Sequence, residues 1–312
     1  MQEKISQDVI ELYDAFTHGL IGRRDFMARL GKIAGGAAAA TALLPLLAND
    51  YAKAAIIDEN DKRLKISTAK FDTGDIVDMI APEEPAPGMA VEPTTHLPFI
   101  TAYHAKPKGD SILPAVIVIS ENRGLNPHIK DVARRIALEG FHAFAVDALS
   151  PYGGTPADED KARAMMGKLN REKMAAKLAK IVEHLALVKT HQRKVGAVGF
   201  CWGGGMVNAL AAASPDLSAG VAYYGRQASA EEAAKIKASL LLHYAGTDER
   251  INAGIAAYEA ALQAAGVDYE THLYEGAQHA FNNDTNEARY NKEAADLAWG
   301  RTIAFFKEKL AF

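Results

Sequence analysis

Short hydrophobic runs and longer stretches of helical spacing alternate along most of this 312-residue chain. Five runs are rich in Val, Ile, Leu, Ala and Phe, and each has the length of one strand: 98–105, 115–120, 141–147, 195–200 and 239–245. Residues 269–274 alternate in the manner of a sixth strand. The stretches between and after them have a helical pattern: 129–139, 161–189, 203–213, 253–265 and 287–309. Strands that alternate with helices predict an α/β fold with a mostly parallel central sheet flanked by helices.

One segment lies outside this alternation. Residues 55–98 contain a Pro-rich stretch at 81–87 and have no clear period, so we expect an irregular entry into the domain. The chain has no internal repeat, and it leaves no room for a large lid domain. We therefore expect one α/β domain over residues 55–312, with a shallow or loop-built pocket that suits small substrates.

The first 54 residues have a different pattern. After a polar start, Arg23 and Arg24 precede a mildly apolar, alanine-rich stretch at 33–48, and residues 52–54 supply a small-x-small cleavage site. This order resembles a twin-arginine export signal over residues 1–54, which predicts a periplasmic or exported protein. The apolar stretch is short and contains a proline, so it is a poor membrane span. The alternative is an amphipathic helical extension that a cytoplasmic protein retains.

Composition limits the functions open to the chain. Hydrophobic residues make up 49% and charged residues 24% of it, as in a typical globular protein. The formal net charge of −4 comes with no basic block, so the electrostatic pattern of a nucleic-acid-binding protein is missing. A single cysteine excludes an intrachain disulfide, and the ten histidines have no metal-ligand spacing. We therefore expect neither a metal nor a cofactor.

The single cysteine stands between a predicted strand and a predicted helix. Cys201 is the central residue of Gly199-Phe-Cys-Trp-Gly203. A nucleophile flanked by glycines at such a turn is the arrangement of the nucleophile elbow, where the turn is strained and backbones approach closely. The N–H groups of the following helix would then point at a developing oxyanion. The simpler alternative is a buried cysteine that packs as a small hydrophobic residue.

An acid and a histidine follow the cysteine in the expected order. Asp248 comes after the predicted strand 239–245, and His279 comes after the predicted strand 269–274. Nucleophile, acid and then histidine is the chain order of the α/β-hydrolases. The histidine would exchange the proton of the thiol, and the aspartate would fix the tautomer of the histidine. Glu249 is a less favoured rival of Asp248.

A further carboxylate narrows the choice of protein family. Glu121 directly follows the run 115–120, at the strand end where α/β sheets build their sites. Three other motifs accompany it: Gly199-Phe-Cys-Trp-Gly-Gly204, Tyr223-Tyr-Gly225 and Glu275-Gly-Ala-Gln-His-Ala-Phe281. With these motifs the chain resembles the dienelactone hydrolases (carboxymethylenebutenolidases) of the α/β-hydrolase superfamily, from about Pro98 to the C-terminus.

The resemblance implies an α/β-hydrolase fold, a catalytic triad, an accessory carboxylate and an oxyanion hole of backbone N–H groups. The residues at the matching positions are Cys201, His279 and Asp248 for the triad, Glu121 for the accessory carboxylate, and Asn122 and Trp202 for the oxyanion hole. In that family the cysteine rests as a thiol that faces the glutamate, and substrate binding releases the thiolate. An adjacent carboxylate does disfavour a thiolate.

The chain departs from the family where the carboxylate of the substrate is held. Two arginines hold it in dienelactone hydrolases, but the matching segments here, 147–151 and Asn282-Asn283, contain none. Arg123 and Arg226 each follow a predicted strand and could supply the positive charge, although a surface role fits them equally well. Asn283 would suit a neutral or differently held substrate. These departures argue against the dienelactone itself and leave a small ester or lactone.

The sequence therefore predicts a hydrolase of small carboxylic esters or lactones that acts through a thioester acyl-enzyme. Its partners would be the small-molecule substrate and, through the N-terminal signal, an export machinery. One alternative is an acyltransferase or peptidase on the same scaffold. Another is a non-catalytic binding or redox-sensing protein in which Cys201 packs or reacts with oxidants. A metal-dependent hydrolase is a more distant third, and the oligomeric state is left open.

Overall fold

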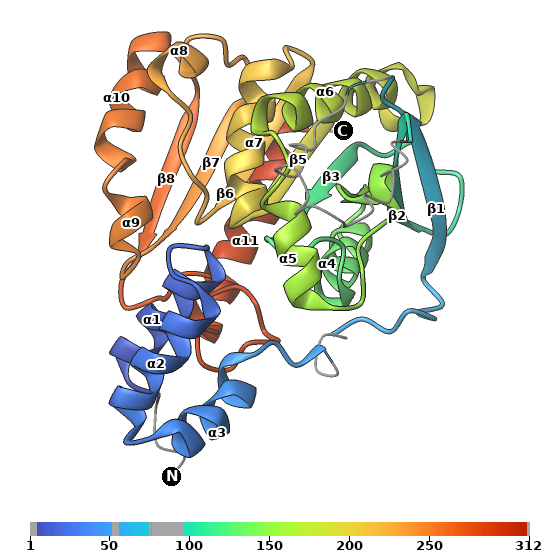
Figure 1. The fold of residues 1–312 in the computed structure, drawn as a ribbon. Helices are drawn as coiled ribbons and strands as arrows, with labels where there is room; N and C mark the ends of the chain where they lie inside the picture. The colour runs from blue at the N-terminus through green and yellow to red at the C-terminus, as the bar shows by residue number, and fades with distance from the viewer. Residues whose placement is uncertain (1–4, 52–55, 75, 77–96, 311–312) are drawn as a thin grey trace, which may run out of the picture.

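An eight-stranded sheet forms the centre of the computed structural model, which describes residues 5–51, 56–74, 76 and 97–310 (Figure 1). The strands are β1 (Leu64–Asp72), β2 (Phe99–Pro107), β3 (Ala115–Ile119), β4 (His142–Asp147), β5 (Val195–Phe200), β6 (Leu217–Tyr223), β7 (Ser239–Ala245) and β8 (Tyr269–Tyr274). Their order is β1-β2-β4-β3-β5-β6-β7-β8. The pairs β1–β2 and β2–β4 are antiparallel, and the other pairs are parallel. The prediction of a mostly parallel sheet is confirmed.

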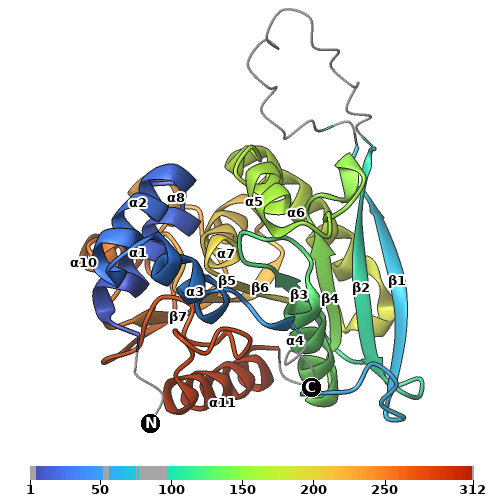
Figure 2. The same cartoon turned by 60° about the horizontal axis from the view of Figure 1, so that its bottom comes forward.

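Helices cover both faces of this sheet. The helices after β3 are α4 (Pro127–Leu138), α5 (Glu159–Met166), α6 (Arg171–Leu187), α7 (Trp202–Ala213), α8 (Ala230–Ala233), α9 (Glu249–Asn252), α10 (Ile255–Ala265) and α11 (Lys292–Lys309). Helices α4 and α11 pack on one face, and α6, α7 and α10 pack on the other (Figure 2). Each face has its own hydrophobic core, because successive side chains of a strand point to opposite faces. Thus Val116 and Val118 of β3 join the core under α4, and Ile117 and Ile119 join the other.

Strand β1 corrects the expectation that residues 55–98 are irregular. All nine of its residues pair with β2 at the edge of the sheet. Only Leu64 and Phe71, near its two ends, are buried. With so few buried positions the hydrophobic alternation that identifies a strand is missing, and pairing with β2 determines the conformation instead. The Pro-rich stretch at 81–87 lies outside the described residues.

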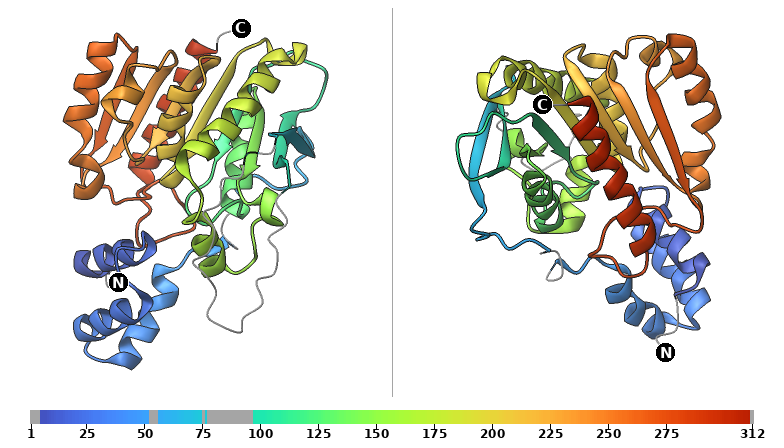
Figure 3. Two further views of the ribbon diagram at one scale, coloured as in Figure 1. Left: turned by 45° about the horizontal axis from the view of Figure 1, so that its top comes forward. Right: turned by 180° about the vertical axis from the view of Figure 1, so that it is seen from behind.

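The beginning of the chain folds into three helices that share a small core. They are α1 (Gln7–Thr17), α2 (Arg23–Ala34) and α3 (Ala37–Leu47). The buried side chains of this core are Val9, Leu12, Tyr13, Phe16, Phe26, Leu30, Ala40 and Leu47. The polar start of the chain therefore contains an amphipathic helix. The three helices lie together at one end of the sheet (Figures 1 and 3).

No single helix in the described part of the chain is long and apolar enough to cross a membrane. Helices α2 and α3 meet the requirements of length and composition only as a pair, which is bent by 107°. The cleavage site predicted at 52–54 lies outside the described residues.

The turn from β5 to α7 is too tight for side chains at its glycines. A Cβ on Gly199 would lie 2.1 Å from the carbonyl oxygen of Gly203, and a Cβ on Gly203 would lie 2.3 Å from that of Ile119. Between these glycines Cys201 has φ = 54° and ψ = −112°, a conformation that residues with side chains rarely adopt. Close backbone packing thus holds Cys201 in a strained turn, as expected from the glycine motif.

We expect Gly203→Ala to lower the free energy of unfolding by about 1–3 kcal/mol, because the new Cβ would overlap backbone atoms that cannot rotate away. Urea denaturation followed by circular dichroism measures the change. Gly300→Ala is the matched control, since Gly300 is exposed within α11 and a Cβ there meets no atom within 4 Å. The control should gain about 0.5–1 kcal/mol of stability. Undiminished stability of Gly203→Ala would contradict the close packing.

Candidate active site

Cys201 lies at the carboxyl end of β5 and lines a cavity there. The residue is only 8% exposed. Its N–H donates to the carbonyl oxygen of Tyr223 at 3.0 Å, and its own carbonyl oxygen accepts from Gly205 at 3.1 Å, so the elbow is tied to both β6 and α7. Trp202 is the first residue of α7, and the first N–H groups of a helix have no acceptor within it. The helix therefore leaves the N–H of Trp202 available to an anion beside the sulfur.

Asp248 and His279 form a buried pair near the cysteine. Asp248 follows β7, His279 follows β8, and Nδ1 of His279 hydrogen bonds to Oδ2 of Asp248. Burial by itself would raise the pKa of Asp248, but the hydrogen bond and the charge of His279 lower it overall. The backbone N–H of Ile251 also donates to Asp248 at 3.2 Å. An ionised Asp248 favours the hydrogen on Nδ1, which leaves Nε2 of His279 as the basic nitrogen.

His279 brings a ring nitrogen close to the sulfur of Cys201. Nε2 of His279 is buried and has no hydrogen-bond partner among the described residues. A ring nitrogen of His279 and Sγ of Cys201 lie within 4.8 Å of one another. Glu249, the rival acid, is exposed and begins α9. The geometry therefore favours Asp248 as the partner of His279.

Glu121 lies directly after β3 and is buried. Its carboxylate accepts hydrogen bonds from Nδ2 of Asn283 at 2.8 Å and from the hydroxyl of Tyr224 at 3.4 Å. Oδ1 of Asn283 in turn accepts the N–H of Thr285 at 3.1 Å. The structure thus places Asn283, which we expected to contact substrate, behind Glu121. There it holds the carboxylate instead of lining the cavity.

The sulfur of Cys201 has a partner that no sequence motif indicated. Nε2 of His18, at the C-terminal end of α1, lies 3.3 Å from Sγ. The ring of His18 also meets the ring of His279 edge-on, with the centroids 4.7 Å apart. The family resemblance predicts a thiol that faces Glu121, whereas the hydrogen bond found here joins the sulfur to His18. The chain separation of 183 residues explains why local patterns gave no signal.

Asp14 orients His18 from one helical turn earlier in α1. Nδ1 of His18 lies 2.8 Å from the backbone oxygen of Asp14 and 3.3 Å from its carboxylate Oδ2. Both atoms are acceptors, so this contact assigns the hydrogen to Nδ1 and turns Nε2 to the sulfur. Burial by itself would lower the pKa of His18, but Cys201 and Asp14 raise it to about 9.

A cavity of about 630 Å³ brings most of the predicted site together. Asn122, Trp202, Cys201 and His279 line it, and the exposed Arg226 stands at its edge. The N-terminal helices and the turn between them supply another part of its wall with Phe16, Thr17, His18, Gly19, Ile21, Gly22 and Arg23. The pocket is therefore not built from the α/β domain alone.

Comparison with known families identifies the scaffold. Residues 100–310 match the sequence model of the dienelactone hydrolase family. This chain belongs to the dienelactone hydrolase family. Residues 1–35 match a different sequence model, described as YqhI-like. His18 and Cys201 thus lie in segments that match two different families.

Relatives and solved structures agree with this membership. A protein of Escherichia coli (strain K12) named "Putative carboxymethylenebutenolidase" is 32% identical over 223 residues, which cover 66% of this chain and 82% of that protein. Protein usf of Aquifex pyrophilus is 36% identical over 219 residues, 68% of this chain and 94% of that protein. A crystal structure titled "Putative Dienelactone Hydrolase", from Klebsiella pneumoniae subsp. pneumoniae MGH 78578, has a TM-score of 0.62 at 29% identity and covers 78% of this chain and 99% of its own. The α/β-hydrolase fold predicted above is confirmed.

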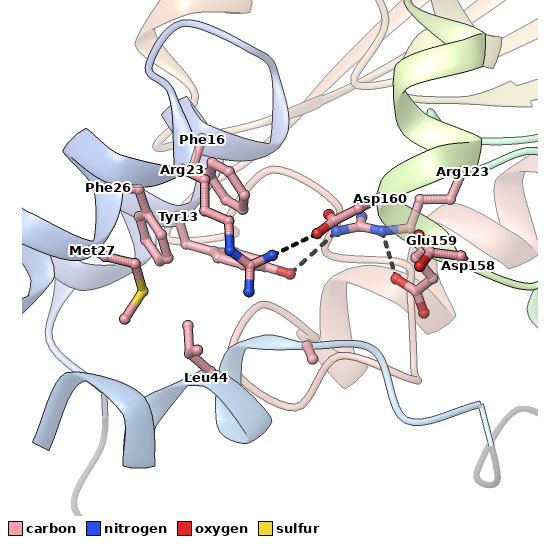
Figure 4. A pocket seen from close by; sticks show the side chains of 11 residues that line it. Tyr13, Phe16, Arg23, Phe26, Met27, Leu44, Arg123, Asp158, Glu159 and Asp160 are labelled. Atoms are coloured by element: carbon pink, nitrogen blue, oxygen red, sulfur yellow. Dashed lines mark hydrogen bonds and ion pairs between the residues drawn. The ribbon is translucent and has the colours of Figure 1, made fainter. Parts of the chain in front are cut away.

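Arg123 lies away from the cavity of this dienelactone hydrolase family member. Figure 4 shows it in a neighbouring pocket, between the N-terminal helices and α5. Its Nε lies 2.6 Å from a carboxylate oxygen of Glu159, and its Nη2 donates to the hydroxyl of Tyr13 at 3.2 Å. These contacts bury the side chain. Arg123 therefore ties the N-terminal helices to the α/β domain, and Arg226 is the candidate that borders the cavity.

The grouping around the sulfur also has the dimensions of a metal site. Sγ of Cys201 and one ring nitrogen each of His18 and His279 lie within 4.8 Å of one another, and a soft divalent cation could be held by such a set. The same arrangement suits a thiol between two bases. A chelator such as EDTA separates these possibilities.

Proposed function

We propose that this member of the dienelactone hydrolase family hydrolyses small carboxylic esters or lactones, with Cys201 as the nucleophile. The observation that carries the proposal is the proximity of a strained, glycine-flanked cysteine to a ring nitrogen of His279. Asp248 holds the other side of this ring, and Nε2 has no hydrogen-bond partner in the described part of the chain. This is the geometry of a nucleophile, its base and the acid that orients the base.

The proposed reaction has two stages. The thiolate of Cys201 attacks the carbonyl carbon, and the N–H groups of Trp202 and Asn122 stabilise the oxyanion that forms. Collapse of this intermediate breaks the ester C–O bond and leaves a thioester on the enzyme. His279 then takes a proton from a water molecule, which attacks the thioester and releases the acid.

Glu121 is the proposed accessory carboxylate. It is buried at the end of β3, the strand beside β5, and its hydrogen bond to Tyr224 connects it to the site. The ring of Tyr224 packs against the ring of His279, with the centroids 5.0 Å apart. A change of charge at Glu121 would therefore alter the electrostatic environment of His279, with the side chain of Tyr224 lying between them.

The edge of the cavity favours an ester that carries a negative charge. Arg226, Lys168 and Arg250 border the cavity near the apolar side chains of Trp202 and Ile251. An apolar pocket with cationic groups at its mouth suits a small acyl group that ends in a carboxylate. We propose Arg226 as the residue that contacts this carboxylate.

Cys201→Ala should lower the turnover of p-nitrophenyl acetate and of small lactones at least 10³-fold, and Asp248→Asn should lower it about 10²–10⁴-fold, measured with EDTA present. Glu249→Gln, at the exposed neighbouring acid, is the matched control and should retain full activity. Undiminished turnover in Cys201→Ala would refute the assignment of the nucleophile.

The other predicted functions give different results in the same assay. Transfer of the acyl group to an added alcohol or thiol in preference to water would favour an acyltransferase. An absence of turnover together with a thiol that does not react with iodoacetamide would favour a non-catalytic binding protein. Loss of activity on addition of EDTA would favour a metal-dependent hydrolase.

Arg226→Gln should raise KM about fivefold for monophenyl succinate, which carries a carboxylate, and leave KM for neutral phenyl acetate unchanged. The reason is the loss of one partly solvated ion pair, worth about 1 kcal/mol. Arg193→Gln removes an exposed arginine outside the cavity and serves as the control. Equal effects on both esters would contradict a contact between Arg226 and the carboxylate.

Export by the twin-arginine route stays a prediction, with a retained cytoplasmic extension as its alternative. Arg23 pairs with Asp160 of α5 at 2.7 Å, and Arg24 is exposed on α2 (Figure 4 shows the first pair). Cleavage at 52–54 would remove the cavity wall that α1 supplies. If α1 stays as a wall of the cavity, the protein isolated from the periplasmic and cytoplasmic fractions of its source has the full-length mass, which is the result we expect. A mass that lacks the first 54 residues would show that the predicted signal is cleaved.

A further inference from the structure

Two histidine–aspartate pairs face the sulfur of Cys201. One is His279 with Asp248, from the loops after β8 and β7. The other is His18 with Asp14, from α1, and its Nε2 is the atom found within hydrogen-bonding distance of Sγ, at 3.3 Å. A single base suffices for a cysteine hydrolase, so the second pair calls for a role of its own.

The environment of His18 is suited to a charged imidazole. The titratable and charged groups around it are Cys201 on the elbow, His279 after β8, Asp14 on its own helix, and behind Asp14 the guanidinium groups of Arg250 and Arg289 at 3.9 and 3.6 Å. Asp14 lies against Nδ1 of His18, with its backbone oxygen at 2.8 Å and its carboxylate Oδ2 at 3.3 Å. An ionised Asp14 stabilises a proton on His18, and an imidazolium in turn stabilises a thiolate.

The position of His18 is fixed by contacts on either side of it. Nδ2 of Asn122 donates to the carbonyl oxygen of Thr17 at 2.8 Å, and Nη1 of Arg163 donates to that of Phe16 at 3.2 Å. At the far end of the segment, Nδ2 of Asn286 donates to the carbonyl oxygen of Leu47 at 2.7 Å. The α/β domain thus holds the helix end that carries His18 through backbone groups, which is what precise placement of a catalytic side chain requires.

We propose that His18 is a further catalytic residue, the base that takes the proton of the Cys201 thiol. The inference rests on the proposed role of Cys201 as nucleophile, and it makes the active site a joint product of the N-terminal helices and the α/β domain. It also divides the work between two bases, because His18 generates the thiolate and Nε2 of His279 stays free to activate water.

The proton balance closes over one turnover. In the resting enzyme the thiol proton moves from Sγ to Nε2 of His18. The thiolate then forms the S–C bond, the ester C–O bond breaks, and the leaving oxygen takes the proton from His18. In the second stage His279 takes a proton from the attacking water, the new C–O bond forms, and the S–C bond breaks. The proton on His279 passes to the pair of Cys201 and His18, which restores the resting state.

Alkylation of Cys201 by iodoacetamide tests the proposal without any substrate. Cys201 is the only cysteine of the chain, so the reaction reports on a single thiol. An ordinary thiol is mostly protonated at pH 6.5, and only the thiolate reacts. We expect His18→Gln to slow alkylation at pH 6.5 at least tenfold and to leave the rate at pH 9.5 nearly unchanged, with EDTA present throughout. Asp14→Asn should give an intermediate loss, because it weakens the charge that holds the proton on His18.

Measurements of kcat and KM distinguish a catalytic role of His18 from a role in packing alone. His18→Gln should lower kcat for p-nitrophenyl acetate about 10²-fold while KM changes little. Gln7→Ala is the control, since it removes a contact between α1 and Gln278 and leaves the imidazole in place. It should preserve both the alkylation profile and kcat. Thermal unfolding of each variant shows that the fold is retained.

Two results would overturn the proposal. An unchanged pH profile of alkylation in His18→Gln would show that His18 only packs against the sulfur. Faster alkylation at every pH would show that it shields the thiol. A failure of the proposed hydrolase function gives a result different from both of these. In that case the wild-type protein turns over no ester, but His18→Gln still changes the rate of alkylation.

Discussion

Close backbone packing around Cys201 is the constraint on which the rest of the structure depends. Gly199 and Gly203 let β5, α7 and the end of β3 approach to distances that no side chain would allow. The resulting turn holds Cys201 at φ = 54° and places its sulfur at the carboxyl edge of the sheet. Any group that acts on the sulfur must therefore come from a segment that reaches this edge.

The N-terminal helices reach this edge of the sheet, and so do the loops of the α/β domain. Their contribution has two physical parts: a section of the cavity wall, and the imidazole of His18 against the sulfur. Residues 1–35 match the YqhI-like model and residues 100–310 match the dienelactone hydrolase family model, so segments that match two sequence families line one cavity. A cysteine that faces a histidine differs electrostatically from one that faces a carboxylate, because an imidazolium favours the thiolate and a carboxylate disfavours it.

Predictions from the sequence succeeded where a residue's environment follows from its own neighbours. Asp248 and His279 each follow a strand of a parallel sheet, so their meeting at its carboxyl edge follows from topology. The same rule was insufficient for Asn283 and Arg123. Both lie at this edge, but their side chains bond to the carboxylates of Glu121 and Glu159, and side-chain partners depend on packing that a motif does not encode.

By itself the sequence determined the fold class, the strained turn at Cys201 and the order of Cys201, Asp248 and His279 after their strands, because each depends on local periodicity or on glycines at fixed spacing. Only the tertiary structure decided that β1 is a strand and that His18 meets the sulfur. The conformation of β1 depends on hydrogen bonds to β2 at the edge of the sheet, which the pattern of its own residues does not indicate. The contact of His18 depends on the docking of a helix that lies 183 residues from Cys201 in the chain. The side chain of Asn122 helps to hold this helix end through the carbonyl oxygen of Thr17, a contact that no local pattern encodes.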